Sequence, residues 1–343
     1  MTTRVDPLCP YFGSCGGCAY QDLTYAEELS LKERNLKTLL QEGLGLSSEV
    51  FLPLIGSPTP YHYRSRLDLS FRRNNGNFLL GFMEEGTRRL VSIDSCAIAR
   101  PEISAFLPPL KALARERLPE NYRSANLVVK TGGEGKVRWG GIGQGSLRLP
   151  PSDYFWTEIE GKKIFYSLDS FFQANLGILP LFLKTLRSLL DLTPETYLLD
   201  LYAGVGLFGV VFAEEARGVW AVEENPSAVQ VAQFNRQFHG LSQVFLRQGK
   251  TEDCLQEILT ALEGEPKVAI VDPPRKGLGR ALEKLIQAKT LRTLVYISCH
   301  PPALLQDLQE FLKAGWRIDR MIPFDFFPRT KHLEVVVRLL AEG

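Results

Sequence analysis

Residues 197–209 read YLLDLYAGVGLFG, and this stretch decides the fold of the chain. A short apolar run ends at Asp200, a glycine loop begins at Gly204, and a helical pattern follows. Glycines in such a loop allow a tight turn and a close approach of the backbone to a ligand. The next apolar run, VWAVE, ends in Glu223, where a carboxylate can accept hydrogen bonds from ribose hydroxyls. The stretch therefore predicts a βαβ unit that binds a nucleotide.

The glycines Gly204, Gly206 and Gly209 also satisfy the GxGxxG pattern of dinucleotide-binding dehydrogenases, which is the competing interpretation. Two features argue against it. Asp200 and Tyr202 are expected to face the pocket with polar groups, and no second glycine-rich half follows downstream. A loop of the form D-x-x-x-G-x-G with an acid at the end of the next strand resembles class I S-adenosylmethionine (SAM) methyltransferases.

The pattern of apolar residues divides the chain into three regions. In residues 166–343, short apolar runs such as KVAIVD and TLVYIS alternate with helical stretches, which predicts a Rossmann-like α/β catalytic domain with parallel strands. Residues 51–165 show short alternating segments broken by turn signals, so we expect an antiparallel β domain with one helix at 101–118. Residues 1–50 hold a cysteine cluster followed by leucines at helical spacing.

Composition and charge limit the location and the partners. The chain has 343 residues, 45% hydrophobic and 23% charged, which is typical of soluble globular proteins. It has no apolar run of the roughly 18 residues that a membrane span needs, and no apolar secretory signal. We therefore expect a cytoplasmic monomer with no membrane partner. A net charge of +1 neither suggests nor excludes a nucleic-acid partner.

One locally basic stretch, residues 61–73, places Arg64 and Arg66 among aromatic residues. Arginine side chains suit phosphates and aromatic rings suit bases, so the stretch could bind RNA. On this stretch alone, the charged outer face of an antiparallel strand pair is the favoured interpretation.

Three further strand ends carry reactive side chains. Asp272 ends the run VAIVD before two prolines, Cys299 follows TLVYIS, and Glu334 opens EVVVRLL. An Asp followed by Pro-Pro and an aromatic residue would suggest methylation of an exocyclic amine, but Arg275 stands in place of the aromatic residue. A core thiol or a solvated strand start would each be ordinary, yet together these residues fall on the ligand rim of one cofactor-binding sheet.

A cysteine and a carboxylate at this rim suit the methylation of a pyrimidine carbon. Carbon 5 of uracil is a poor nucleophile, but a thiolate that adds to carbon 6 turns the ring into an enolate that can attack a methyl group. A general base must then remove the hydrogen from carbon 5, and the thiolate leaves by elimination. One cysteine and one carboxylate therefore suffice.

The chain as a whole resembles the RNA uracil-C5 methyltransferases, which make 5-methyluridine in ribosomal and transfer RNA. The resemblance covers nearly the whole chain and rests on DSFFQANLG, DLYAGVGLFG, AVEENPSAVQVAQFN, VDPPRKGL, YISCHPPALLQDL and FPRTKHLEVVVRL, in this order. It implies that Cys299 is the nucleophile, that Glu334 is the base, and that His332 shapes the site beside Glu334. It also implies a SAM site with the residues Gln173, Tyr202, Gly204, Glu223 and Asp272.

Three positions depart from the family pattern. Ala203 replaces a cysteine that does no chemistry, so little changes there. His300 stands where an Asn commonly follows the nucleophile, which could change the contacts with uracil. Leu207 stands where some members have a polar residue, so one SAM contact is expected to be missing.

Cys9, Cys15 and Cys18 lie close together near the N-terminus, and Cys96 lies far along the chain. Four thiolates can bind zinc or an iron–sulfur cluster, and a disulfide framework is improbable in a cytosolic chain of this length. Zinc sites more often use two close pairs, so three close ligands and a distant one favour a cluster. Cluster-bearing family members show this spacing, which implies a 4Fe–4S cluster with a structural or RNA-positioning role. Cys254 is expected to be a buried helix residue.

The resemblance also favours ribosomal RNA over transfer RNA as the substrate. Residues 61–73 and the cluster segment are the expected RNA surface, with Arg64, Arg66 and His332 as substrate-binding residues. We expect no TRAM-like β-barrel before Cys9, and a cluster without that barrel is most similar to the shorter 23S ribosomal RNA enzymes. The alternatives are a transfer-RNA uridine-C5 methyltransferase, an iron–sulfur redox protein, and an RNA-binding protein with an inactive methyltransferase site.

Overall fold

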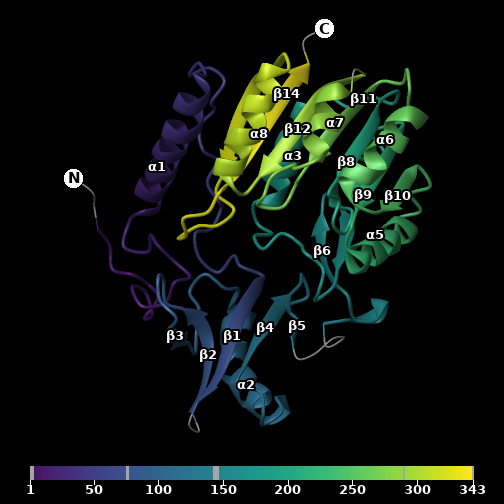
Figure 1. Cartoon of the computed structure of the whole chain (residues 1–343). Helices are drawn as coiled ribbons and strands as arrows, with labels where there is room; N and C mark the ends of the chain where they lie inside the picture. The colour runs from purple at the N-terminus through teal and green to yellow at the C-terminus, as the bar shows by residue number, and fades with distance from the viewer. Residues whose placement is uncertain (1–3, 75–76, 142–146, 289, 342–343) are drawn as a thin grey trace.

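The computed structural model describes residues 4–74, 77–141, 147–288 and 290–341, and Figure 1 shows two main sheets, one above the other. The larger, catalytic sheet has the strand order β10-β9-β8-β11-β12-β14-β13. Its strands are β8 Tyr197–Leu201, β9 Gly218–Glu223, β10 Val244–Gln248, β11 Lys267–Val271, β12 Leu291–Ser298, β13 Trp316–Phe324 and β14 Glu334–Ala341.

The direction of the strands locates the ligand rim of this sheet. Neighbouring strands from β10 across to β12 pair in parallel, whereas β14 runs antiparallel to both β12 and β13. The strand order reverses between β8 and β11, and ligands bind outside the carboxyl ends of the strands at such a reversal. The predicted α/β class with parallel strands is confirmed, and its sheet is mixed because of β14.

Helices cover both faces of the catalytic sheet (Figure 1). One face carries α3 Leu179–Leu190, α4 Leu207–Phe212 and α5 Pro226–Phe238, and the other carries α6 Thr251–Ala261, α7 Ala281–Gln287 and α8 Pro301–Lys313. Successive residues of β11 pack alternately on the two faces, since Ile270 joins the first apolar cluster and Val271 joins the second. A strand buried on both faces has a continuous apolar sequence, which is the pattern that predicted it.

The smaller sheet is antiparallel, with the strand order β3-β2-β1-β4-β5. Its strands are β1 Arg66–Asn74, β2 Asn77–Met83, β3 Leu90–Ser92, β4 Ser124–Thr131 and β5 Val137–Gly140. The helix α2 Pro101–Arg117 covers one face, where its Leu107 packs with Leu67 and Leu127 of the sheet. The antiparallel sheet and the helix predicted at 101–118 are confirmed.

A hairpin of β6 Phe155–Ile159 and β7 Lys162–Tyr166 follows a short 3-10 helix at Pro151–Asp153 and forms a sheet of its own. The sequence pattern grouped residues 155–165 with the antiparallel region, but in the structure the hairpin lies against α5. The side chain of the buried Asn235 on α5 accepts a hydrogen bond from Phe165 N through its Oδ1 at 2.8 Å. Its Nδ2 donates to Phe165 O and to Val205 O, both at 2.9 Å. The hairpin is thereby tied to the glycine loop.

The N-terminal region packs against the catalytic sheet. The helix α1 Tyr25–Leu36 confirms the predicted helical segment, and it continues as a π-helix, Lys37–Glu42, whose Leu40 is fully buried beside α8. Residues 51–55 then follow the edge strand β13 through isolated bridges. No helix within the described ranges combines the length and apolarity needed to cross a bilayer.

Candidate active site

The glycine loop after β8 holds the acidic end of β9 in place. Gly204 and Gly206 have φ angles of 56° and 81°, in the left-handed region that glycine tolerates best. Gly204 N donates to Glu223 Oε2 at 2.9 Å, and Asn225 N donates to Glu223 Oε1 at 2.7 Å. Each carboxylate oxygen keeps a second lone pair, so Glu223 can still accept hydrogen bonds from a ribose.

Asp200, at the end of β8, supports this loop from below. Its side chain is fully buried, and its Oδ2 accepts from Gly209 N at the start of α4 at 3.2 Å. Burial raises the pKa of Asp200 to about 7. Tyr202, by contrast, spans two loops, because its half-buried hydroxyl donates to Leu278 O at 3.4 Å.

The strand directions bring the predicted nucleophile and base together. Asp272 follows β11 and Cys299 follows β12, so both lie at the carboxyl rim of the sheet. β14 is antiparallel to β12, and its residue Val335 pairs with Ser298. The start of β14, with Glu334, therefore lies beside the end of β12, with Cys299.

These groups act on one another electrostatically. Burial raises the pKa of Cys299 to about 11, and the charges of Glu334 and Asp272 add to the rise while Arg275 opposes it. Burial, with help from Asp272, raises the pKa of Glu334 well above its usual value, and Arg275 again opposes the rise. Burial also raises the pKa of Asp272 to about 7. The site is thus a group of desolvated acidic side chains, and Arg275 is the cation that opposes the rise in the pKa of Cys299 and Glu334. The sequence analysis did not identify Arg275 as a site residue.

His332 lies next to that cation. Its Nδ1 is 3.2 Å from Arg275 Nη2, and partial desolvation together with the charges of Arg275 and Arg64 lowers the pKa of His332. Arg64 therefore lies near the catalytic rim, as a substrate-binding role would require. Arg66 forms an ion pair with Asp68, two residues further along the same strand, at 2.7 Å.

Gln173, the remaining predicted SAM contact, is 7% exposed, and its Oε1 has no hydrogen-bond partner in the described structure. Two buried residues that the sequence analysis missed fix the segment around it. Lys130 Nζ donates to Ser167 O at 2.7 Å, and Asn175 Nδ2 donates to Phe326 O at 3.2 Å, next to the loop that leads to Glu334. No sequence signal distinguished this lysine from the other basic residues of the β region.

Comparison with known proteins shows to which family this chain belongs. Residues 153–342, more than half of the 343-residue chain, match the family model described as tRNA (Uracil-5-)-methyltransferase. This chain belongs to that family. The 23S rRNA (uracil(1939)-C(5))-methyltransferase RlmD of Klebsiella pneumoniae is 30% identical to it, over 97% of this chain and 81% of that protein. An uncharacterized RNA methyltransferase of Thermosynechococcus vestitus is 28% identical, over 98% of this chain and 84% of that protein. The chain is therefore a SAM-dependent RNA uracil-C5 methyltransferase.

A solved structure confirms the fold. The tRNA (uracil-54, C5)-methyltransferase of Pyrococcus abyssi, determined in complex with S-adenosyl-L-homocysteine, superposes with a TM-score of 0.73. The match covers 96% of this chain and 86% of that chain, at 22% sequence identity. The methyltransferase fold with its mixed sheet is thus shared by both chains.

The structure gives the departures from the family pattern a physical meaning. His300 caps the N-terminus of α8, because its Nδ1 accepts from Ala303 N at 3.3 Å. An Asn at this position would be an equally good cap, so the exchange preserves the start of the helix. Leu207 is 6% exposed and belongs to the apolar cluster on the α4 face, which explains why an apolar residue is tolerated there.

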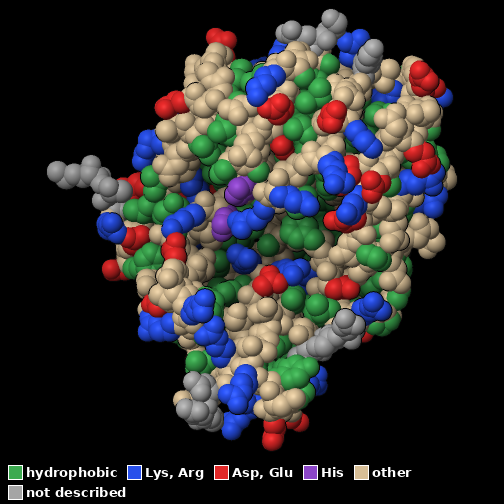
Figure 2. All heavy atoms as spheres, in the orientation of Figure 1, with side chains coloured by type: hydrophobic (Ala, Val, Ile, Leu, Met, Phe, Trp, Pro, Cys, Tyr) green, Lys and Arg blue, Asp and Glu red, His purple; other side chains and the backbone are tan. Residues whose placement is uncertain are grey.

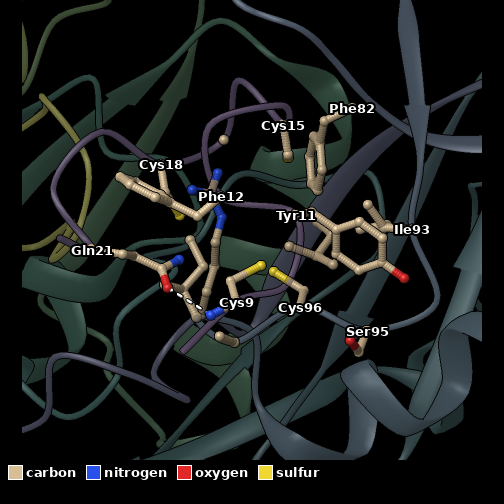
Figure 3. A pocket seen from close by; sticks show the side chains of 15 residues that line it. Cys9, Tyr11, Phe12, Cys15, Cys18, Gln21, Phe82, Ile93, Ser95 and Cys96 are labelled. Carbon is tan, nitrogen blue, oxygen red and sulfur yellow. Dashed lines mark hydrogen bonds between the residues drawn. The ribbon is translucent and has the colours of Figure 1, made fainter. Parts of the chain in front are cut away.

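The four cysteines assigned to metal binding line a single cavity of about 40 Å³ (Figure 3). In this view the sulfur atoms of Cys9 and Cys96 point toward one another, and Cys9 N donates to Gln21 Oε1 at 3.0 Å. Gly16 N donates to Met83 O at 3.0 Å, which ties the segment to β2. Cys254, by contrast, is a half-buried residue of α6 and not a fully buried one.

The placement of the four thiols can be compared with what a metal site needs. Within the described ranges, no three His, Cys, Asp or Glu side chains are grouped so that they could hold a metal ion. A zinc site would need all its sulfurs at about 2.3 Å from one point. Four thiols are also the donor set of iron–sulfur clusters, so the chemistry of the lining fits such a group while no formed metal site is seen in this part of the chain.

Proposed function

We propose that this enzyme methylates carbon 5 of one uridine in 23S ribosomal RNA, with Cys299 as the nucleophile and Glu334 as the general base. The observation that carries the proposal is the meeting of this thiol and this carboxylate at the ligand rim, on neighbouring antiparallel strands. The pair lies at the rim that also carries the glycine loop of a methyltransferase sheet, which is where a pyrimidine and a methyl donor have to meet.

The reaction balances with these two residues. The thiolate of Cys299 forms a bond to carbon 6, and the electron pair of the ring double bond becomes an enolate. SAM supplies the methyl group and, through its positive sulfonium, a charge that favours the thiolate. After carbon 5 has been methylated, the Glu334 carboxylate takes the proton from carbon 5. The enolate then expels the Cys299 thiolate, and the double bond returns.

The resting thiol keeps its proton until the substrates arrive. The pKa of Cys299 is raised to about 11, so this group is neutral in the free protein near neutral pH, and burial raises the pKa of Glu334 as well. A negative charge on one of these groups makes ionisation of its neighbours less favourable. Arg275 is the neighbouring cation that opposes the rise in the pKa of both Cys299 and Glu334. We therefore assign to Arg275 the stabilisation of the thiolate in the first step and of the carboxylate in the later one.

The SAM site consists of the predicted residues around the glycine loop. We assign the ribose to Glu223, because Gly204 N and Asn225 N fix its carboxylate at the rim. Gln173, with its unpartnered Oε1, and Tyr202, Gly204 and Asp272 complete the set. Asp200 is assigned to the support of the loop.

We further propose that Cys9, Cys15, Cys18 and Cys96 hold a 4Fe–4S cluster. Support comes from the shared cavity and from the donor chemistry, since four thiolates are a standard ligand set for such clusters. The role of the four cysteines would be structural, because the cluster segment is hydrogen-bonded to β2 through Gly16 and to the loop before β14 through Ala19.

The RNA has to present an unstacked uridine to the rim, because a base inside a helix cannot reach Cys299. Figure 2 shows Lys and Arg side chains gathered across the middle of one face, near the His side chains. Arg64 and His332 are assigned to the RNA, since they lie near the rim, whereas Arg66 is assigned a weaker part because Asp68 already binds it. We place the protein in the cytoplasm.

The choice of 23S ribosomal RNA rests on the similarity to RlmD at 30% identity over most of both chains. Transfer RNA is the second candidate, because the family description and the Pyrococcus abyssi structure both name it. Mass-spectrometric mapping of 5-methyluridine in both RNAs of a deletion strain decides between them. We expect one 23S site to lose its methyl group and to regain it with the wild-type gene but not with Cys299→Ala. Loss confined to transfer RNA would overturn the ribosomal assignment, and restoration by Cys299→Ala would overturn the mechanism.

A further inference from the structure

Residues 325–333, which we name the catalytic loop, join β13 to β14 and end beside the general base. Phe324 and Glu334 form the last pair of the two strands, so the loop determines where Glu334 starts. Four successive backbone carbonyls of the loop accept hydrogen bonds from four different parts of the chain. These are Phe326 O from Asn175 Nδ2 at 3.2 Å, Phe327 O from Lys32 Nζ at 3.1 Å, Pro328 O from the Tyr63 hydroxyl at 2.9 Å and Arg329 O from Ala19 N at 2.7 Å.

Three residues of α1, Tyr25, Glu28 and Lys32, lie at the centre of this support. Lys32 Nζ lies 2.8 Å from both Glu28 Oε1 and Asp325 Oδ1 and donates to Phe327 O, so its three N–H groups are all used. Asp325 Oδ2 accepts from the Tyr25 hydroxyl at 2.9 Å. The helix α1 therefore fixes the first residues of the catalytic loop.

Arg329 holds the middle of the loop in a left-handed conformation, with a φ angle of 68°. Its backbone N–H donates to Glu28 Oε1 at 2.6 Å. Its Nη1 donates to Leu23 O at 2.8 Å and lies 3.4 Å from Glu28 Oε2, while the guanidinium lies 4.6 Å over the ring of Tyr61. One glutamate of α1 thus holds both the backbone and the side chain of Arg329.

Glu28, Lys32, Asp325 and Arg329 form a buried quartet whose side chains are at most 6% exposed. The desolvation of two positive and two negative charges offsets much of their attraction, so such a network adds little stability. Glu28 Oε2 and Arg329 Nε have no hydrogen-bond partner in the described structure, so the geometry is imposed by the ion pairs and the remaining hydrogen bonds. Any shift that separates these ions leaves a charge unpaired in a medium of low dielectric constant. Here the geometry that the network imposes is that of the catalytic loop.

We propose that the buried quartet is the positioning device of the general base, which holds the catalytic loop so that Glu334 reaches the hydrogen on carbon 5 of uracil. This role depends on the proposed function of Glu334. Glu334 Oε2 has no hydrogen-bond partner among the described residues, so the backbone on either side has to set its position. A misplacement of about 1 Å at a reacting group costs roughly 10²-fold in rate.

The test separates proton removal from methyl transfer. Transcripts of 23S ribosomal RNA and of transfer RNA, made with [5-³H]uridine, are incubated with the full-length enzyme and [methyl-¹⁴C]SAM. The ¹⁴C in RNA reports methyl transfer, and the ³H in water reports removal of the hydrogen from carbon 5. The variant Lys32→Met/Asp325→Asn removes one charge of each sign. The matched control, Arg187→Met/Glu215→Gln, removes an ion pair of 2.9 Å that joins α3 to the segment after α4.

In the wild type and in the control, we expect release of ³H to keep pace with incorporation of ¹⁴C. In Lys32→Met/Asp325→Asn, we expect release of ³H to fall by about 10- to 100-fold while the first turnover of ¹⁴C changes by less than about threefold. A covalent protein–RNA adduct that survives a denaturing gel should then accumulate. Release that stays coupled to methyl transfer in the folded variant would overturn the positioning role.

Glu334→Gln distinguishes a failure of this role from a failure of the proposed mechanism. If Glu334→Gln accumulates the adduct and the quartet variant does not, the positioning role alone is wrong. If Glu334→Gln releases ³H at the wild-type rate, the base assignment fails and the positioning role fails with it. Should the double variant not fold, Tyr25→Phe carries the same test, because it removes the hydrogen bond to Asp325 together with the one that Ser57 N donates to the same hydroxyl at 2.7 Å. We expect release of ³H to lag about threefold behind incorporation of ¹⁴C, and release that stays coupled would overturn the positioning role.

Discussion

Two groups of thiols in this chain show how neighbours decide the chemistry of a cysteine. Cys299 lies at the rim of the catalytic sheet, and the charged groups that act on it are two carboxylates and one guanidinium. The other group comprises Cys9, Cys15, Cys18 and Cys96, which surround one cavity, and the groups that raise the pKa of Cys18 after its burial are the other three cysteines.

Burial is common to both groups and does not distinguish them. It raises the pKa of Cys299 to about 11 and that of Cys18 to about 12. The difference lies in what surrounds each sulfur. A carboxylate beside a thiol provides a partner for proton transfer, whereas thiols beside thiols provide a ligand set. Variants in the two groups should therefore fail in different ways.

The largest difference is expected from alanine substitutions. Cys299→Ala removes the only group in the proposed mechanism that bonds to carbon 6, so methyl transfer should fall by about 10⁴-fold or more. Transfer of radiolabelled methyl groups to RNA measures it. Cys254→Ala, on α6, is the matched control and should leave the rate unchanged. Activity of Cys299→Ala within tenfold of the wild type would show that Cys299 is not the nucleophile.

The carboxylate next to Cys299 gives the next largest effect. Glu334→Gln keeps the shape of the side chain but cannot accept the proton from carbon 5, so turnover should fall by about 10²- to 10⁴-fold. Denaturing gels with labelled RNA should show the adduct accumulating, which the cysteine variant cannot form. The surface variant Glu310→Gln on α8 is the control. Rapid turnover of Glu334→Gln without an adduct would show that Glu334 is not the general base.

Serine substitutions in the cavity test the ligand set. Cys18→Ser or Cys96→Ser should lower the iron content from about four per chain to less than one, because an alcohol is a poor replacement for a thiolate ligand. Iron and sulfide assays, with visible absorbance, measure the loss in protein purified without oxygen. Cys299→Ser should keep all of its iron. Equal iron in all three proteins would show that the cavity does not hold the cluster.

The smallest effect concerns the acidity of Cys299. Because its pKa is raised to about 11, alkylation by iodoacetamide in the free protein should increase about tenfold per pH unit from pH 7 and level off only near pH 11. Glu334→Gln removes a negative neighbour and should lower that midpoint, whereas Arg275→Met removes a positive one and should raise it. Mass spectrometry of the peptide isolates Cys299 from the other thiols. A plateau near pH 8.5 would mean that the rim is more solvated than the structure indicates.

The sequence patterns predicted the features that depend on local order. Strands such as β11 are buried on both faces and therefore appear as continuous apolar runs. The positions of Asp272 and Cys299 at one edge of the sheet were predicted because parallel strands place their carboxyl ends on one edge, and both residues follow such ends. The glycine loop and the acid of β9 were found by the same rule.

The features that depend on distant contacts were not predicted. Glu28 and Lys32 are spaced as an ordinary surface pair on a helix, and only residues about 300 positions later in the chain bury them. The carboxylate of Asp200 accepts from Gly209 N, a contact with α4 that no local pattern predicts.

The position of β14 has a consequence for how the enzyme comes into being. β14 follows β12 and β13 in the chain, yet it lies between them in the sheet. During synthesis, this strand leaves the ribosome after the other strands of the sheet, and β13 joins the sheet only through β14. Completion of the sheet and acquisition of Glu334 are then one event, so under the proposed mechanism a nascent chain that already carries Cys299 has no base with which to finish the reaction.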